Sequence, residues 1–447
     1  MKYCKRCLYP ENHPYGLIFD SEGICSGCRV HEEKDVLDWA ARFKMLERIV
    51  GVSAKQTAGR GFDCIIPVSG GGDSYFIVHT VKNVLGLNPL LVHYNPHYNT
   101  QIGIRNLANL ATVFDCDVVT STVSPSLLKR ITRQSLRKFG SMYWQVLAGG
   151  LTFPVQVAVK FRIPLIIWGV QPWSDQCGMY SHLDEVEMTE RCRVEHGLMG
   201  IYGQELVDED ASVTAHDLLP FTYPDDSHLE AVGVRGLYLS NYIRWDSKAQ
   251  HEEMIRLYGY ETAQQQRTFN TYEDVHCFHS AGLHDWLKYL RLGYGKVTDH
   301  ASREIRLKRM SREEGAAMVQ QYSAVEPADL PLFLDWVEME EQEFLDCVWN
   351  RRDPRIWKRG EDDVWCLRDS VVNHLADDGV EAARLHQNDS CEFLLTPSGD
   401  PSHKEDEYLL MGRGYLDKYN YGAREDQPPG GGMTRRLWQA PSLIGRS

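Results

Sequence analysis

The chain has 447 residues, 43% of them hydrophobic and 25% charged, a composition typical of a soluble globular protein of two or three domains. The formal net charge of −14 argues against a surface built to bind nucleic acid, apart from a local basic groove. The longest apolar runs fall far short of the roughly 20 residues that a membrane helix needs. No apolar stretch follows the charged start, so we expect a cytoplasmic protein without a membrane anchor.

Two CxxC pairs lie near the N-terminus, Cys4 with Cys7 and Cys25 with Cys28. Two such turns bring four thiolates around one ion, and this spacing is typical of a structural zinc site in which sulfur leaves no position for water. Four unrelated buried cysteines are the alternative. We assign residues 1–50 to a zinc-binding module with a linking helix, and we expect the remaining cysteines to be buried thiols.

Apolar runs of strand type alternate with helical patterns over residues 51–260, after a charged, helix-compatible stretch at 32–50. The strand-type runs are 62–68, 89–95, 116–123 and 163–170, and the helical patterns between them cover 77–85, 104–114 and 126–161. Nearly continuous apolar strands that alternate with helices indicate a parallel sheet covered on both faces, so the predicted fold is a doubly wound α/β sheet. Ligands of such sheets bind beyond the carboxyl ends of the strands.

The first strand runs into a glycine loop, SGGGDS, before the next helix. The loop comprises Ser69, Gly70, Gly71, Gly72, Asp73 and Ser74. A bare loop at this point exposes backbone N–H groups and lets a phosphate approach the positive end of the helix dipole. The serine hydroxyls suit phosphate oxygens, and Asp73 suits a magnesium ion. A plain tight turn is the alternative. The loop is not a Walker loop, since no lysine follows the glycines, and it is not GxGxxG.

SGGGDS resembles the SGGxDS pyrophosphate loop of the N-type ATP pyrophosphatases, the PP-loop group, whose fold is of the adenine nucleotide alpha-hydrolase type. Four further segments add to the resemblance: the cysteine-rich start, IPLIIWG, VRGLYLSNYIRWD at 234–246, and 282–315. Together they are similar to the N-acetyl sugar amidotransferases of surface-polysaccharide biosynthesis, over residues 1 to about 345. The chain departs from that family at Gly72, where many members have lysine, and at Val170, where members tend to have an acidic residue.

The resemblance implies a ligase-type reaction that uses ATP and magnesium. The acetamido oxygen of a nucleotide-linked N-acetyl sugar is adenylated, and ammonia then displaces AMP to give an acetamidino group. An amide carbon is a poor electrophile and AMP is a good leaving group, so activation lets ammonia attack at neutral pH. The alternatives are a PP-loop amidase or thiolase acting on another small molecule or RNA, and a non-catalytic scaffold that binds zinc and a nucleotide.

The resemblance further implies that Asp73 and Lys296 are the catalytic residues, with Lys296 reaching the phosphates. Arg303 and Arg306 lie at i,i+3 spacing, which puts two guanidinium groups on one helix face. We interpret them as a pyrophosphate clamp, with a solvated helix face as the alternative. Asp299 is either a second magnesium ligand or the partner of Lys296.

Other candidates follow from their position after the predicted strands. His93 and Tyr94 end the second strand and Gly169 ends the fourth, where adenine and ribose are expected to bind. Trp173 either stacks on a base or is a core aromatic.

Two further groups have open interpretations. Arg130, Arg133 and Arg137 form one helical stripe that either holds the diphosphate of a sugar nucleotide or is a solvated helix face. His284 and Asp285 either handle protons or form a buried hydrogen-bonded pair.

Ammonia needs a source, and no glutaminase signature is visible. The family implies a separate glutaminase, with a barrel-fold cyclase-like partner, and free ammonium is the alternative. We assign residues 261–349 to a helical region that binds substrate and pyrophosphate, and 350–447 to an extension. Its Pro and Gly cluster at 428–432 predicts a flexible exit, beyond which Trp438 and Leu443 are expected to dock on the body or on a partner.

Overall fold

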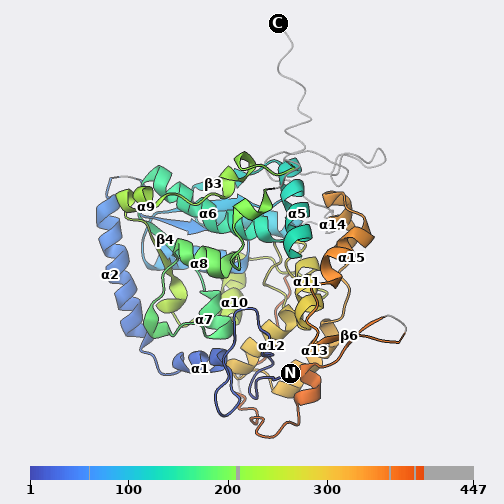
Figure 1. Cartoon of the computed structure of the whole chain (residues 1–447). Helices are drawn as coiled ribbons and strands as arrows, with labels where there is room; N and C mark the ends of the chain where they lie inside the picture. The colour runs from blue at the N-terminus through green and yellow to red at the C-terminus, as the bar shows by residue number, and fades with distance from the viewer. Residues whose placement is uncertain (60, 208–211, 362–363, 387–388, 397–447) are drawn as a thin grey trace.

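The computed structural model describes residues 1–59, 61–207, 212–361, 364–386 and 389–396. A five-stranded parallel sheet organises the fold, with the strand order β3-β2-β1-β4-β5 (Figure 1). The strands are β1 (Cys64–Pro67), β2 (Pro89–Asn95), β3 (Val118–Thr122), β4 (Leu165–Trp168) and β5 (Arg235–Tyr238). The chain winds outward from β1 in both directions, so the predicted doubly wound α/β fold is confirmed. The exit predicted at 428–432, with Trp438 and Leu443, lies outside the described residues.

Helices cover both faces of the sheet because side chains alternate along each strand. Cys64 and Ile66 of β1 pack on one face, and Ile65 packs on the other. The first face is covered by α2 (Trp39–Thr57), α3 (Gly72–Val78) with its π-helical continuation His79–Val84, α4 (Gln101–Val113) and α10 (Ser247–Tyr258). The second face is covered by α6 (Trp144–Phe161) and α9 (Asp226–Val232). The strand ends therefore form one edge at which the loops after β1, β2 and β4 meet.

The helix-compatible stretch at 32–50 is divided between two helices, because the chain breaks within it. α1 (Ser26–Glu33) ends at Lys34, whose Nζ lies 2.6 Å from a carboxylate oxygen of Asp175. α2 begins after Asp38, whose side chain accepts a hydrogen bond from the Ala41 N–H. A tertiary ion pair and a helix cap thus split the stretch into two helices.

The chain between β4 and β5 forms several short helical elements that we did not predict from the sequence. They are α7 (Pro172–Cys177), α8 (Glu190–Cys192) and the π-helix Arg193–Gly197. α7 packs against α1 and so joins the N-terminal module to the sheet. Within the described parts of the chain, we find no helix with the length and apolar character needed to span a bilayer.

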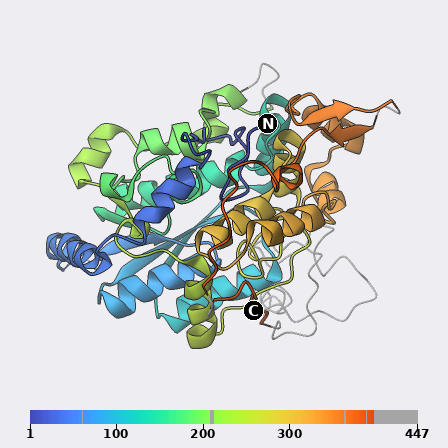
Figure 2. The same ribbon diagram turned by 90° about the horizontal axis from the view of Figure 1, so that it is seen from below.

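The C-terminal region is mainly helical, as predicted. It consists of α11 (Leu283–Leu292), α12 (Lys296–Arg306), α13 (Arg312–Tyr322), α14 (Leu330–Val337), α15 (Glu341–Trp349) and an antiparallel hairpin of β6 (Trp357–Arg359) and β7 (Trp365–Leu367). Aromatic residues such as Trp286 and Trp336 bury it against α5 (Pro125–Phe139). Figure 2 shows the hairpin projecting from the edge of the molecule.

Candidate functional site

The two CxxC pairs fold into one cluster. The Sγ atoms of Cys4 and Cys28 are 3.9 Å apart, those of Cys7 and Cys25 are 3.6 Å apart, and all four lie within 4.8 Å of one another. A tetrahedral zinc ion with bonds of about 2.3 Å to sulfur needs edges of about 3.8 Å, so the four thiols fit it as they stand. All four are buried, and the cysteine cluster can therefore hold a metal ion out of contact with water.

Arg306 of α12 lies against the cysteine cluster. Its Nη2 is 3.6 Å from Cys25 Sγ and donates to the Gln176 carbonyl at 2.9 Å, while Nη1 donates to the Asp175 carbonyl at 2.8 Å. Four thiolates around a divalent cation leave net negative charge, which a guanidinium at this distance stabilises. Arg306 also lines the cavity beside the glycine loop. Its role as a phosphate clamp stays a prediction.

The glycine loop joins β1 to α3, as predicted. The Ser69 N–H donates to the Ser74 hydroxyl at 3.1 Å, and the Gly71 N–H donates to the Ser69 hydroxyl at 3.3 Å. Gly70 has a φ of +81°, and a Cβ there would lie 2.5 Å from the Gly103 carbonyl oxygen of α4. Any other residue at position 70 is therefore excluded by the backbone conformation and by the close approach of α4.

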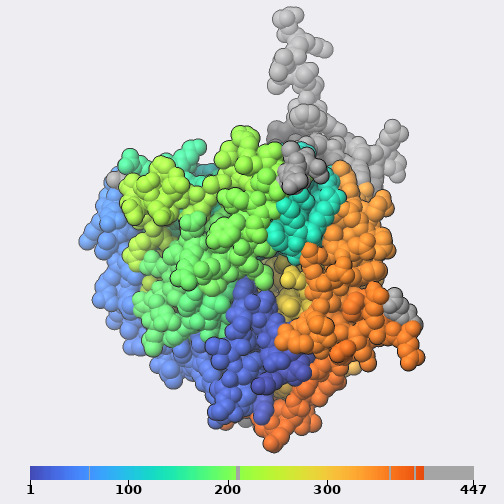
Figure 3. Space-filling model, viewed as in Figure 1, coloured from blue at the N-terminus to red at the C-terminus, as the bar shows by residue number. Residues whose placement is uncertain are grey.

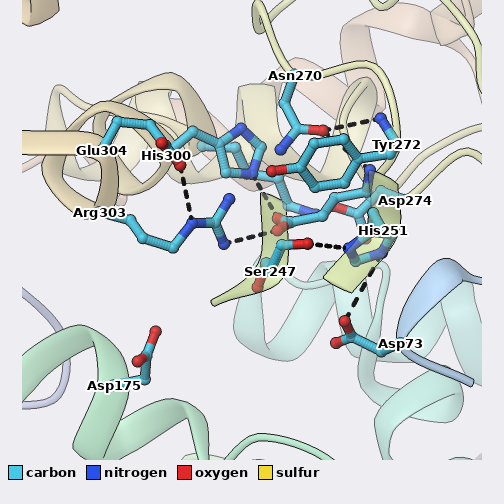
Figure 4. A network of polar contacts seen from close by, with 12 residues as sticks. Asp73, Asp175, Ser247, His251, Asn270, Tyr272, Asp274, His300, Arg303 and Glu304 are labelled. Carbon is cyan, nitrogen blue, oxygen red and sulfur yellow. Dashed lines mark hydrogen bonds and ion pairs between the residues drawn. The ribbon is translucent and has the colours of Figure 1, made fainter. Parts of the chain in front are cut away.

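Gly72 leaves room for a histidine that the sequence analysis missed. A Cβ at Gly72 would lie 1.9 Å from Cδ2 and 2.2 Å from Nε2 of His251, in α10. The ring is held firmly, because Nδ1 donates to the Ser247 carbonyl at 2.6 Å and the ring stacks on Tyr272 with centroids 4.3 Å apart. Burial lowers the pKa of His251 to about 4, so the imidazole is neutral, with Nε2 3.7 Å from Asp73 Oδ1 (Figure 4). A lysine at position 72 would overlap this ring.

A cavity of about 230 Å³, here the loop cavity, opens between the glycine loop and α12. Its walls carry charges of both signs, from Asp73, Asp175, Glu273, Asp274, Asp299, Lys296, Arg303 and Arg306. Val170, which departs from the family pattern, adds an apolar wall. A mixture of carboxylates and cations around one cavity is the arrangement that a phosphate with a divalent cation needs.

Asp73 faces the loop cavity with an unused oxygen. Its side chain is 43% exposed, while Oδ1 is buried without a hydrogen-bond partner in the described structure. Burial and the charge of Glu273 raise the pKa of Asp73 to about 7. Among the described residues, only the cysteines bring three ligating groups within metal-binding distance of one another. Asp73 therefore fits a magnesium ion held mainly by phosphate oxygens and water, as is common for this ion.

Lys296 and Arg303 reach the same cavity from one face of α12. The Lys296 ammonium contacts the Asp274 carboxylate and donates to the Ser280 hydroxyl at 2.8 Å. Burial alone would lower the pKa of Lys296, but the charge of Asp274 raises it. Arg303 pairs with Glu273 at 2.6 Å, and its Nη2 is buried with no partner in the described structure. Among the described residues that line the cavity, Asp73 and Asp299 each have a buried carboxylate oxygen without a hydrogen-bond partner, and Arg303 and Arg306 each have a buried guanidinium nitrogen without one.

Asp299 and Asp285 are both committed to ion pairs. Asp299 lies 2.6 Å from Lys288, so the carboxylate partner of Lys296 is Asp274 and not Asp299. Asp285 pairs with Arg267 at 3.0 Å, and both side chains are 0% exposed. The structure favours the buried-pair interpretation for Asp285.

His284 and Trp173 pack as aromatic rings. His284 stacks on Tyr143 with centroids 4.2 Å apart, and burial together with the charge of Lys296 lowers its pKa to about 3. Trp173 is buried and meets Tyr15 edge-on at 6.3 Å. These contacts favour the core interpretation of Trp173.

The residues predicted to hold adenine and ribose lie at the ends of β2 and β4. The His93 Nδ1 donates to the Val68 carbonyl at 2.9 Å, and the Tyr94 hydroxyl donates to Gln145 Oε1 at 2.8 Å. Both side chains are thus engaged inside the fold, whereas Gly169 offers only backbone. Their contact with a nucleotide stays a prediction.

The basic stripe on α5 is satisfied by contacts within the protein. These contacts join Arg130 to the Ser212 carbonyl, Arg133 to the Val337 carbonyl and Arg137 to the Glu343 carboxylate. The stripe therefore docks α5 onto neighbouring segments, and binding of a sugar-linked diphosphate there stays a prediction.

Several residues of the loop cavity were missed by sequence reasoning. Glu273 and Asp274 carry a weak signal, since two adjacent carboxylates occur in the turn-rich segment FNTYEDVH. Asp175 and His251 carry no signal of their own, because the packing of α7 and α10 brings them to the loop.

A family of known proteins matches part of the C-terminal region. Residues 266–370 match the family described as LPS biosynthesis protein WbpG-like, C-terminal domain. A search of the curated proteins gives no match. Among solved structures, NMN synthetase from Francisella tularensis is similar at 12% identity, over 51% of this chain and 98% of that chain, with a TM-score of 0.26. Residues 266–370 are thus similar to the C-terminal domain of the WbpG-like LPS biosynthesis proteins, which supports the resemblance to a surface-polysaccharide family over this range.

Proposed function

We propose that the protein is an ATP-dependent amidotransferase acting on a nucleotide-linked N-acetyl sugar. It adenylates the acetamido oxygen and replaces AMP with ammonia, giving an acetamidino group and releasing AMP and pyrophosphate. The observation that carries the proposal is a cavity that Asp73 of the SGGGDS loop lines together with Lys296 and Arg303 of α12. The WbpG-like match in residues 266–370 supports an acceptor from LPS biosynthesis.

The chain's own residues have separate tasks in this reaction. The loop backbone and the hydroxyls of Ser69 and Ser74 bind the β- and γ-phosphates, next to the N-terminus of α3. Lys296 and Arg303 neutralise the charge on the departing pyrophosphate, exchanging the carboxylates that they now contact for phosphate oxygens. Magnesium, when bound by Asp73 and the phosphates, would supply further charge neutralisation.

The remaining components follow the same proposal. Zinc in the cysteine cluster has a structural role, because four sulfur ligands leave it no open position. Ammonia comes from a separate glutaminase, with a barrel-fold cyclase-like partner, or from free ammonium. We place the reaction in the cytoplasm, where ATP and nucleotide-linked sugars are available.

The test is a reaction of the full chain with ATP, magnesium chloride, ammonium chloride and a panel of UDP-linked N-acetyl sugars, analysed by mass spectrometry. AMP together with a product in which NH replaces O supports the proposal. Replacement of O by S when a sulfur donor is added supports the thiolase alternative. Absence of AMP with every acceptor supports the scaffold alternative and contradicts the proposal.

A further inference from the structure

A second cavity, of about 680 Å³, hollows the face of the molecule shown in Figure 3. It lies between the N-terminal module (dark blue), the α5–α6 segment (teal) and the C-terminal region (orange), with α11 (yellow) at its floor. Its apolar wall includes Trp144, Leu147 and Leu287. A cavity of this size accommodates a small molecule of several rings.

The second cavity adjoins the loop cavity. Gln176, Lys296 and Asp299 line both of them. A substrate in the second cavity can therefore bring one group to the wall formed by Lys296 while its body stays outside the loop cavity. Adenylation needs this arrangement, because the acceptor oxygen must reach the α-phosphate of ATP.

The two carboxylates that line the second cavity are already paired. Asp285 is committed to Arg267, and Asp299 is committed to Lys288. Three cations of its lining have no carboxylate partner among the described residues, and we call them the cation cluster: Lys138, Arg291 and Arg351. Uncompensated positive charge in one cavity is notable in a chain with a formal net charge of −14.

The cation cluster is assembled from three segments. Lys138 Nζ donates only to backbone carbonyls, those of Glu205 and Val207 at 2.6 and 2.9 Å. Arg351, beyond the end of α15, donates to the Lys138 carbonyl at 2.9 Å, so these two residues are adjacent. Carbonyl contacts position the two cations but leave their charges unneutralised.

Arg291, near the end of α11, completes the cluster. No hydrogen bond or ion pair of its guanidinium is found within the described parts of the chain. Arg291 and Arg351 line the same cavity, and burial together with the charge of Arg351 lowers the pKa of Arg291. Two guanidinium groups and an ammonium that repel one another form a binding site for a multivalent anion.

We propose that the cation cluster binds the phosphate or diphosphate group of the acceptor, with the body of the acceptor along the apolar wall. The proposal rests on the proposed function for the identity of the acceptor. Both His284 and Arg291 line the cavity, and seven residues of α11 separate them by about 10 Å. A sugar ring can therefore lie between an amide near Lys296 and phosphates near Arg291.

The test measures binding by calorimetry, with the loop cavity filled by a saturating nonhydrolysable ATP analogue. The probes are UDP-N-acetylglucosamine, UDP and free N-acetylglucosamine. Arg291→Met should weaken binding of both diphosphate probes about tenfold or more, because a charge-assisted contact is lost. Arg291→Lys keeps the charge and should retain most of the affinity. Free N-acetylglucosamine should bind weakly to every variant.

Arg191→Met is the matched control, because Arg191 is exposed, pairs with Glu195 and lines neither cavity. The affinity of the control variant for the probes should equal that of the wild type. A second control is the affinity of Arg291→Met for the ATP analogue, which should not change. The proposal is overturned if Arg291→Met binds UDP-N-acetylglucosamine like the wild type, or if Arg191→Met loses as much affinity as Arg291→Met.

Failure of the proposed function has a different signature. If diphosphate probes bind through Arg291 but no acceptor yields AMP, the cation cluster stands and the amidotransferase reaction does not. If AMP forms while neither diphosphate probe binds to the wild type with the loop cavity filled, the reaction stands and the cation cluster is rejected.

Discussion

At the scale of single residues, the imidazole of His251 determines what the glycine loop tolerates. It is held by the Ser247 carbonyl and by stacking on Tyr272, and it fills the space beside Gly72. Glycine at position 72 is thus required by a neighbour from α10, whereas glycine at position 70 is required by a positive φ and by α4. Two glycines of the same loop, Gly70 and Gly72, are thus required for different physical reasons.

Gly72→Ala should destabilise the fold by about 1–3 kcal/mol, because the new Cβ overlaps a pinned ring. In a His251→Ala background Gly72→Ala should instead increase the free energy of unfolding, since alanine is favoured over glycine within a helix by up to about 1 kcal/mol. Urea unfolding of the two single variants and the double variant measures this coupling. Additive effects would show that His251 does not occupy the space of a residue-72 side chain.

Asp73→Asn preserves the size of the side chain and removes its charge. We expect AMP formation to fall by about 100-fold or more, because the oxygen available to magnesium loses its negative charge. AMP release is measured by chromatography, and zinc content by a metal assay that should be unchanged. Retained turnover would refute the role of Asp73.

At the scale of elements, the buried carboxylate of Asp285 in α11 holds the start of α12. Asp285 accepts from Arg267 and also from the Lys296 N–H, at 2.5 Å, at the start of α12. One carboxylate thus positions the helix that carries Lys296 and Arg303. The geometry of the loop cavity depends on this joint.

Asp285→Asn should cost about 3–5 kcal/mol of stability, because it leaves the Arg267 guanidinium buried without its charge partner. Glu343→Gln, which removes the exposed pair with Arg137, is the control and should cost no more than about 1 kcal/mol. Chemical denaturation of both variants measures the difference. Equal effects would mean that the buried pair has no special role.

The local pattern of apolar residues predicted correctly those elements that are buried along their whole length. The run at 89–95 is buried along its whole length, and β2 has the same bounds as the prediction. The break within the helix-compatible stretch at 32–50 could not be predicted, because it depends on Asp175, which is distant in sequence. The glycine loop was predictable from its motif, but His251 was not, because only the packing of α10 on α3 brings it there.

At the scale of the whole molecule, the N-terminal module forms part of the wall of the loop cavity, through Tyr9. The Leu8 N–H donates to the Ser302 hydroxyl, and Arg312 donates to the carbonyls of Cys4 and Cys7. The N-terminal module therefore supports α13 and also α12, which carries the cations of the loop cavity.

Cys7→Ala or removal of the metal by a chelator should cost at least about 3 kcal/mol, since the folding free energy of such modules comes largely from the metal. The affinity for an ATP analogue should fall as well, because Arg306, which lines the loop cavity, loses the metal-bound thiolates that it contacts. Calorimetric unfolding and analogue binding measure the two effects. The control is Cys366→Ala, at an exposed cysteine, and an equal response there would contradict the role of the cluster.

The contact of Leu8 with Ser302 spans 294 residues, which has a consequence for biosynthesis. At about 5–20 residues per second, a ribosome needs roughly 15–60 s to make the helix that packs on the cysteines after they have emerged. Throughout that interval the nascent chain exposes four thiols to oxidants and to competing ions. An ion captured in that interval is enclosed when α12 packs on the cysteines.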